Sequence, residues 1–102
     1  MNSIMTLRQK QSKFAHMVAL LILHAEQLGF EVTLGDAWAT SGHIDDSYHY
    51  KRLAIDLNLF KNGHYMTETE DHEPLGLYWE SIGGSWGGRF NDGNHYSLGE
   101  GN

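Results

Sequence analysis

The sequence feature that most constrains the fold is the alternation of residues 53–59, LAIDLNL. Leu or Ile occupies every second position, and Ala, Asp and Asn stand between them. This period of two predicts a β-strand with one apolar face against a core. Aspartate is disfavoured in mid-strand, so Asp56, on the opposite face, needs a partner. An ion pair with Lys51, Arg52 or Arg89 would meet this need, and so would a metal ion.

Apolar residues recur at helical spacing from about Thr6 to Leu28, which predicts a long amphipathic helix. Thr6 and Gln9 form a weak capping box at its start, and Gly29 stands where a helix usually ends. Basic residues precede the apolar run 17–23, as in a signal peptide, but no small-residue cleavage site follows. The run is also shorter than the roughly 20 residues of a membrane span. We therefore expect a retained core helix, no export signal and no stable membrane insertion.

The rest of the chain is predicted to form short strands, a second helix and turns. Residues 30–38 alternate, with Phe30, Val32 and Leu34 expected on one face of a strand. Acids and Pro74 suit the start of the second helix. The further predicted elements are a polar loop at 39–46, a strand from about 52 to 59, a hairpin turn at 61–64, a short strand at 65–67, a helix from about 75 to 82, a glycine-rich loop at 83–93 and a last strand at 94–98.

Length and composition bound the fold class and the binding partners. A chain of 102 residues, 40% hydrophobic and 20% charged, suits one globular domain with one modest core. The predicted class is α+β: a long N-terminal helix and a shorter second helix packed on a small antiparallel sheet. The domain is expected to span 1–102, with 1–5 and 99–102 disordered. A net charge of -6 with only 7 Lys and Arg argues against nucleic-acid binding.

Two segments carry the side chains of a candidate metal site. There is no cysteine, so any metal must be bound by His, Asp or Glu. His49 precedes Asp56 by seven residues, and Asp92 precedes His95 by three; other histidines and acids repeat both spacings, so spacing alone is weak. Two histidines and one carboxylate are a known ligand set for zinc and for Fe(II). Iron oxygenases of that kind use a larger double sheet than this length allows.

Two other polar stretches leave alternatives open. Residues 67–74, TETEDHEP, are interpreted as the approach to a helix, and a calcium site made by Glu68, Glu70 and Asp71 is the alternative. His43 lies in the polar loop and is interpreted as a solvated histidine, with a ligand or substrate contact as the alternative.

These segments resemble the M15 family of zinc peptidases, which includes D-Ala-D-Ala carboxypeptidases and dipeptidases and phage L-alanyl-D-glutamate endopeptidases. The family pattern Ser-x-His-x6-Asp is matched by residues 47–56, and Glu- or Asp-x2-His by residues 92–95. The run Gly-Gly-x-Trp-Gly-Gly-x-Phe at 83–90 is similar to the phage and prophage branch. The resemblance extends from about Leu7 to Leu98, and its specificity lies in the combination of these pieces.

The resemblance implies an enzyme that cuts peptides of peptidoglycan. It implies Zn²⁺ held by His49, Asp56 and His95, with Asp92 as general base. Such a peptidase is expected to act as a monomer and to be an endolysin, kept in the cytoplasm until its release to the cell wall, or virion-associated. The alternative is a non-catalytic wall-binding or virion module on the same scaffold.

The chain departs from the family pattern in two places. Relatives often carry an arginine just after the first strand, where this chain reads DAWA at 36–39. That arginine helps to hold the substrate, and Arg52 or Arg89 is expected to replace it. The glycine common between the histidine and the aspartate is also absent, and Leu53 stands near its place. Ser47 is expected either to bond the substrate or a ligand or to be a plain turn or capping serine. The candidate substrate-binding residues are Ser47, Arg52, Arg89 and Trp86.

Overall fold

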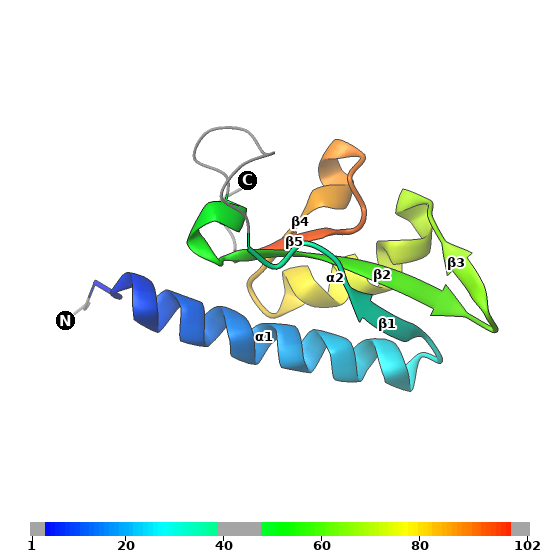
Figure 1. Cartoon of the computed structure of the whole chain (residues 1–102), viewed down its shortest axis with the longest axis horizontal. Helices are drawn as coiled ribbons and strands as arrows, with labels where there is room; N and C mark the ends of the chain where they lie inside the picture. The colour runs from blue at the N-terminus through cyan, green and yellow to red at the C-terminus, as the bar shows by residue number, and fades with distance from the viewer. Residues whose placement is uncertain (1–3, 39–47, 99–102) are drawn as a thin grey trace.

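Strand β2, Ala54–Lys61, is the centre of the fold, because three other strands pair with it. The computed structural model describes residues 4–38 and 48–98, and Figure 1 shows their arrangement. The elements in chain order are α1 (Leu7–Gln27), β1 (Glu31–Leu34), the 3-10 helix η1 (Tyr48–Lys51), β2, β3 (His64–Met66), the 3-10 helix η2 (Thr69–His72), α2 (Glu73–Ser81), β4 (Ser85–Trp86), the 3-10 helix η3 (Gly87–Phe90) and β5 (His95–Ser97).

The predicted α+β class is confirmed: two helices pack on a small antiparallel sheet of order β1-β2-β5-β4, with β3 also on β2. Helix α1 runs along the sheet (Figure 1). Its capping box forms both bonds, from the amide of Gln9 to Thr6 Oγ1 at 3.1 Å and from the amide of Thr6 to Gln9 Oε1 at 2.8 Å. Gly29, at φ 92°, follows its end. No helix in the described ranges is long and apolar enough to cross a membrane.

The two faces of β2 are as the alternation predicts. Leu53, just before the strand, and Ile55, Leu57 and Leu59 within it are buried in the core with Phe14, Met17 and Leu21 of α1. Asp56 is half-buried on the opposite face. The face that carries Asp56 is therefore turned away from the core.

The predicted hairpin turn after β2 is confirmed at Asn62 and Gly63, which both have the positive φ that such turns require.

Strands β5 and β3 pair with successive parts of β2, and β1 pairs alongside. In the β2–β5 ladder, Asp56 lies directly opposite His95. Directly opposed residues of an antiparallel pair point to the same face, with Cβ atoms about 5 Å apart. The register alone therefore brings a carboxylate and an imidazole together.

Several predicted boundaries are corrected by the structure. The first strand is only Glu31–Leu34, and Leu34 is 61% exposed instead of sharing the buried face of Phe30. The glycine-rich stretch 83–93 contains β4 and η3, because Ser85 and Trp86 pair with β5. The second helix begins at Glu73, with Pro74 in its first turn as predicted. The predicted disorder at 1–5 and 99–102 falls largely outside the described residues.

Candidate metal centre

Three side chains from three elements converge at one end of β2. His49 comes from η1, Asp56 from β2 and His95 from β5, and one ligand atom of each lies within 4.8 Å of the others. Asp56 Oδ1 is 3.3 Å from His49 Nε2 and 3.5 Å from His95 Nδ1. The two imidazoles meet edge to face, with ring centroids 5.1 Å apart. One carboxylate oxygen and two imidazole nitrogens therefore lie close enough together to share one metal ion.

The chain brings His49 to the strand through a tight corner. The amide of Leu53 donates to the carbonyl of Tyr48 at 2.9 Å, which closes the turn between η1 and β2. Within that turn Arg52 has φ 59°. A left-handed backbone is unusual for a residue with a side chain and costs of order 1 kcal/mol. Position 52 is therefore the one in this turn whose backbone conformation favours glycine. It lies one residue before Leu53, near which the glycine of the family pattern was expected.

Two of the three separations within the ligand group match the edge of a tetrahedral zinc site, and the third is at most 4.8 Å. Zinc bonds to imidazole nitrogen and carboxylate oxygen are about 2.0–2.2 Å long, so neighbouring ligand atoms of a tetrahedron lie about 3.3 Å apart. The separations of 3.3 and 3.5 Å from Asp56 Oδ1 match that edge length. Two imidazoles and one carboxylate suit zinc and also other first-row divalent metals, and three protein ligands leave a fourth position open.

The two ring nitrogens of His95 have different surroundings. Nδ1 faces Asp56 Oδ1 at 3.5 Å, whereas Nε2 is buried and has no hydrogen-bond partner in the described part of the chain. Nδ1 is therefore the nitrogen that a metal ion beside Asp56 would bind. Among the described residues, its second nitrogen lacks the hydrogen-bonded group that usually orients a metal-bound histidine.

Comparison with known families gives one match. A family model described as D-alanyl-D-alanine carboxypeptidase, one of the M15 peptidases, matches residues 39–98. The chain belongs to this family. The match includes the three converging side chains and leaves α1 outside it. No curated protein matches the chain.

Membership of the M15 family bears on the alternatives left open by the sequence. It supports a peptidase rather than an iron oxygenase. The calcium alternative gains no support, since among the described residues only His49, Asp56 and His95 have ligand atoms grouped closely enough to hold a metal ion. Asp71 Oδ2 instead accepts from the amide of Glu68 at 2.9 Å and caps η2. His43 lies outside the described residues.

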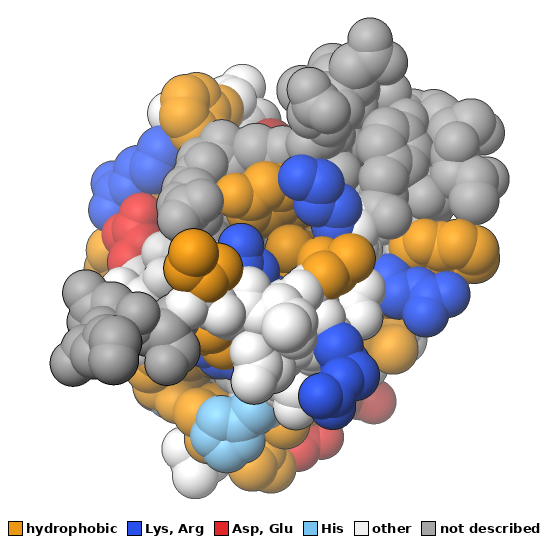
Figure 2. Space-filling view, turned by 90° about the vertical axis from the view of Figure 1, so that its left-hand side faces the viewer, with side chains coloured by type: hydrophobic (Ala, Val, Ile, Leu, Met, Phe, Trp, Pro, Cys, Tyr) orange, Lys and Arg blue, Asp and Glu red, His pale blue; other side chains and the backbone are white. Residues whose placement is uncertain are grey.

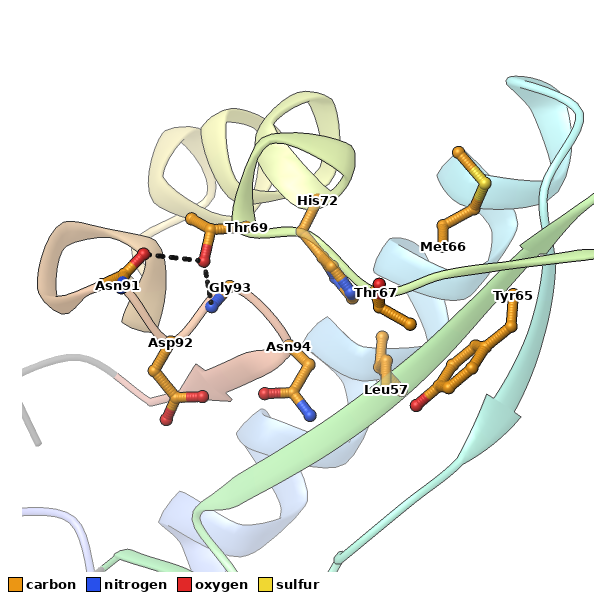
Figure 3. Close-up of a pocket in the computed structure, with 10 residues that line it drawn as sticks. All are labelled: Leu57, Tyr65, Met66, Thr67, Thr69, His72, Asn91, Asp92, Gly93 and Asn94. Carbon is orange, nitrogen blue, oxygen red and sulfur yellow. Dashed lines mark hydrogen bonds between the residues drawn. The ribbon is translucent and has the colours of Figure 1, made fainter.

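Asp92, the predicted general base of the M15 pattern, lies in a turn that ends at His95. The carbonyl of Asp92 accepts from the amide of His95 at 3.2 Å, and its own side chain is exposed. Figure 3 shows this turn as one wall of a polar cavity of about 170 Å³. Gly93 of this turn is needed for space, because a Cβ there would lie 2.6 Å from Thr69 Cα.

The structure separates the candidate substrate-binding residues. Ser47 lies outside the described residues. Arg89 makes two hydrogen bonds to the carboxylate of Glu80, at 2.7 and 2.9 Å, and this ion pair raises the pKa of Arg89 and lowers that of Glu80. Trp86 is 4% exposed and its indole N–H donates to the carbonyl of Gly93 at 2.8 Å. Only Arg52 of these four is both described and placed in the corner beside His49.

The side chain of Arg52 also contacts the stretch 36–39, where M15 relatives often carry arginine. Its guanidinium carbon lies 4.4 Å from the centre of the Trp38 ring, and Trp38 stands within the DAWA stretch. Arginine stacks favourably on indole, so this contact orients the guanidinium. No sequence pattern predicts this pairing, because it depends on the turn at Arg52, φ 59°, and on the backbone bonds that hold residues 35–36 against Asp56.

Two further residues near the site were not singled out by the sequence. Gly35 lies against Asp56, where a Cβ would be 3.0 Å from the Asp56 carbonyl oxygen. His72 is 3% exposed, and its Nδ1 is 2.8 Å from the hydroxyl of Tyr96, next to His95. Burial lowers the pKa of His72 to about 4 and raises that of Tyr96, so both are neutral at pH 7. His72 is thus a buried histidine outside the ligand group.

Proposed function

We propose that the protein is a zinc-dependent peptidase that hydrolyses peptide bonds of peptidoglycan stem peptides. The observation that carries the proposal is the convergence of His49, Asp56 and His95 in a chain of the M15 family. Zinc held by these three side chains would supply a Lewis acid and an acidified water at its open position. Helix α1 lies outside the range that the family model matches, but it packs on the sheet, so we assign it to the same peptidase domain.

In this proposal Asp92 moves the protons of the reaction. Its carboxylate is exposed in the turn before His95, so a water and a substrate amide can approach it. As general base it takes a proton from the attacking water, and as general acid it then gives that proton to the leaving amine. One carboxylate can serve both steps because it is regenerated in its ionised form after the second.

The finer assignment is an endolysin of the L-alanyl-D-glutamate endopeptidase or D-Ala-D-Ala carboxypeptidase type, from a phage or prophage. It rests on the resemblance of residues 83–90 to that branch. The charge distribution is compatible with an anionic wall despite the net charge of -6. All but two of the 7 Lys and Arg residues lie in α1 or at 51–52, and Figure 2 shows Lys and Arg side chains spread over that end of the molecule.

The proposal is tested with zinc-loaded protein and purified peptidoglycan. We expect new amine termini, and mass spectrometry of the released peptides identifies the bond that is cut. The alternative is a non-catalytic wall-binding module. The lack of an arginine in residues 36–39, DAWA, where relatives often carry one, favours this alternative. Sedimentation with peptidoglycan without new amine termini would decide for the module, provided that the sample holds one zinc per chain.

Arg52, rather than Arg89, is proposed to hold the substrate. Replacing Arg52 by glycine removes the guanidinium and leaves a residue that adopts φ 59° without strain. We expect kcat/KM to fall about 10- to 100-fold, as for the loss of one charged hydrogen bond, mainly through KM. Arg89→Ala is the control, because that side chain is exposed and paired with Glu80, and kcat/KM should change less than about twofold. The opposite result for the two variants would assign the role to Arg89.

A further inference from the structure

The turn that carries Asp92 is held by two side chains at a single residue. Gly93 accepts at its carbonyl from the indole N–H of Trp86, at 2.8 Å, and donates from its amide to Thr69 Oγ1, at 3.3 Å. Figure 3 shows Thr69 bonded to both Gly93 and Asn91 across the cavity wall. Gly93 directly follows Asp92. The bond to its amide fixes the peptide plane between residues 92 and 93, and the bond to its carbonyl fixes the plane between residues 93 and 94.

The indole of Trp86 is itself fixed from two sides. A Cβ on Gly76 of α2 would lie 2.1 Å from Trp86 Cδ2, and a Cβ on Gly88 of η3 would lie 2.2 Å from Cζ2. Both distances are far shorter than a carbon–carbon contact of about 3.5–4.0 Å. The ring therefore fills a slot that only glycine backbones leave open, and it cannot rotate without moving α2 or η3.

We infer that Trp86 is a positioning residue that orients Asp92 relative to His95 through the carbonyl of Gly93. This inference rests on the proposed role of Asp92. It gives the glycine-rich stretch 83–93 a function: Gly88, together with Gly76 of α2, leaves room for the indole, and the indole N–H holds the turn. His95 depends on this bond less than Asp92 does, because the ladder with Asp56 also holds it.

Trp79 provides a matched control within the same core. It is fully buried, its N–H also donates to a backbone carbonyl, that of Ser97 at 2.8 Å, and a glycine, Gly84, also packs against its indole. The same N–H also lies 3.2 Å from the carbonyl of Ser85 in β4, and both acceptors lie outside the turn of Asp92. Trp79→Phe therefore removes the same kind of bond without touching the turn of Asp92.

The test compares Trp86→Phe with Trp79→Phe in the zinc-loaded protein. Both should lower the unfolding midpoint. Only Trp86→Phe should lower kcat, by about 10- to 100-fold, since a displacement of about 1 Å costs that much. KM should stay unchanged, and zinc affinity should change by less than about tenfold, the smallest loss typical of groups that orient a ligand. Equal kcat in the two variants would overturn the inference.

A second readout does not depend on activity. The amide NMR resonances of Asp92, Gly93 and Asn94 should shift in Trp86→Phe and stay in place in Trp79→Phe. If the wild-type protein were inactive, these resonances would still decide whether Trp86 sets the turn, and the proposed function alone would fail. If Trp86→Phe does not fold, Thr69→Val removes the other bond to Gly93 and should produce the same resonance shifts and a smaller loss of kcat. Unchanged resonances would contradict the inference.

Discussion

Replacing His49 by alanine should leave the protein without bound zinc and without peptidase activity. His49 is 2% exposed, and its Nε2 lies 3.3 Å from Asp56 Oδ1. Its loss would leave two ligands where stable zinc sites use three or four. The zinc content after dialysis should fall from one per chain to near zero. Activity should fall by more than about 100-fold, the upper range for groups that only orient a ligand.

Unfolding measurements test the same change without substrate. A ligand present at about 1,000 times its Kd stabilises the folded state by about 4 kcal/mol. Added zinc should therefore raise the free energy of unfolding of the wild-type protein and not that of His49→Ala. His72→Gln is the control, since His72 is equally buried but bonds to Tyr96 instead of to Asp56. A His49→Ala protein that keeps one zinc per chain would show that the metal is held elsewhere.

The sequence predicts an element of the fold wherever its hydrophobic pattern repeats often enough for the period to be recognised. The seven-residue alternation at 53–59 and the helical spacing of α1 each repeat several times, so both elements are found. The middle of the apolar stripe of α1 is buried as expected, whereas Leu7 and Leu28 at its two ends are exposed. Strand β4 has two residues and no period to detect. It exists because Trp86 pairs with Tyr96 of β5, and such a pairing is a property of the folded chain.

The site could be predicted as a set of residue types but not as a geometry. An aspartate in mid-strand required a partner, which singled out Asp56. The register that sets Asp56 opposite His95 joins residues 39 positions apart and depends on packing throughout the sheet. The contact of Arg52 with Trp38 was likewise invisible, because it depends on a backbone conformation that sequence preference argues against for arginine. The departures from local preference thus lie beside the candidate centre.

Replacing Asp92 by asparagine should abolish turnover while the zinc stays bound. The amide has nearly the shape of the carboxylate but does not accept a proton near neutral pH, so kcat should fall by about 10²- to 10⁴-fold. Asp92 is not among the three converging side chains, so zinc content and the response of stability to zinc should match the wild-type protein. This combination separates a general base from a ligand, because His49→Ala should lose both activity and metal.

Asp92→Glu is the matched variant, since the M15 pattern accepts either acid at this position. It restores the carboxylate with one more methylene, and its kcat should exceed that of Asp92→Asn by at least about tenfold. The bonds of Gly93 to Trp86 and Thr69 are untouched by either substitution, so the turn should keep its shape in both. Equal activity of the two variants would mean that the protons travel by another group. Loss of zinc from Asp92→Asn alone would make Asp92 a ligand, and the open position for water would then have to lie elsewhere.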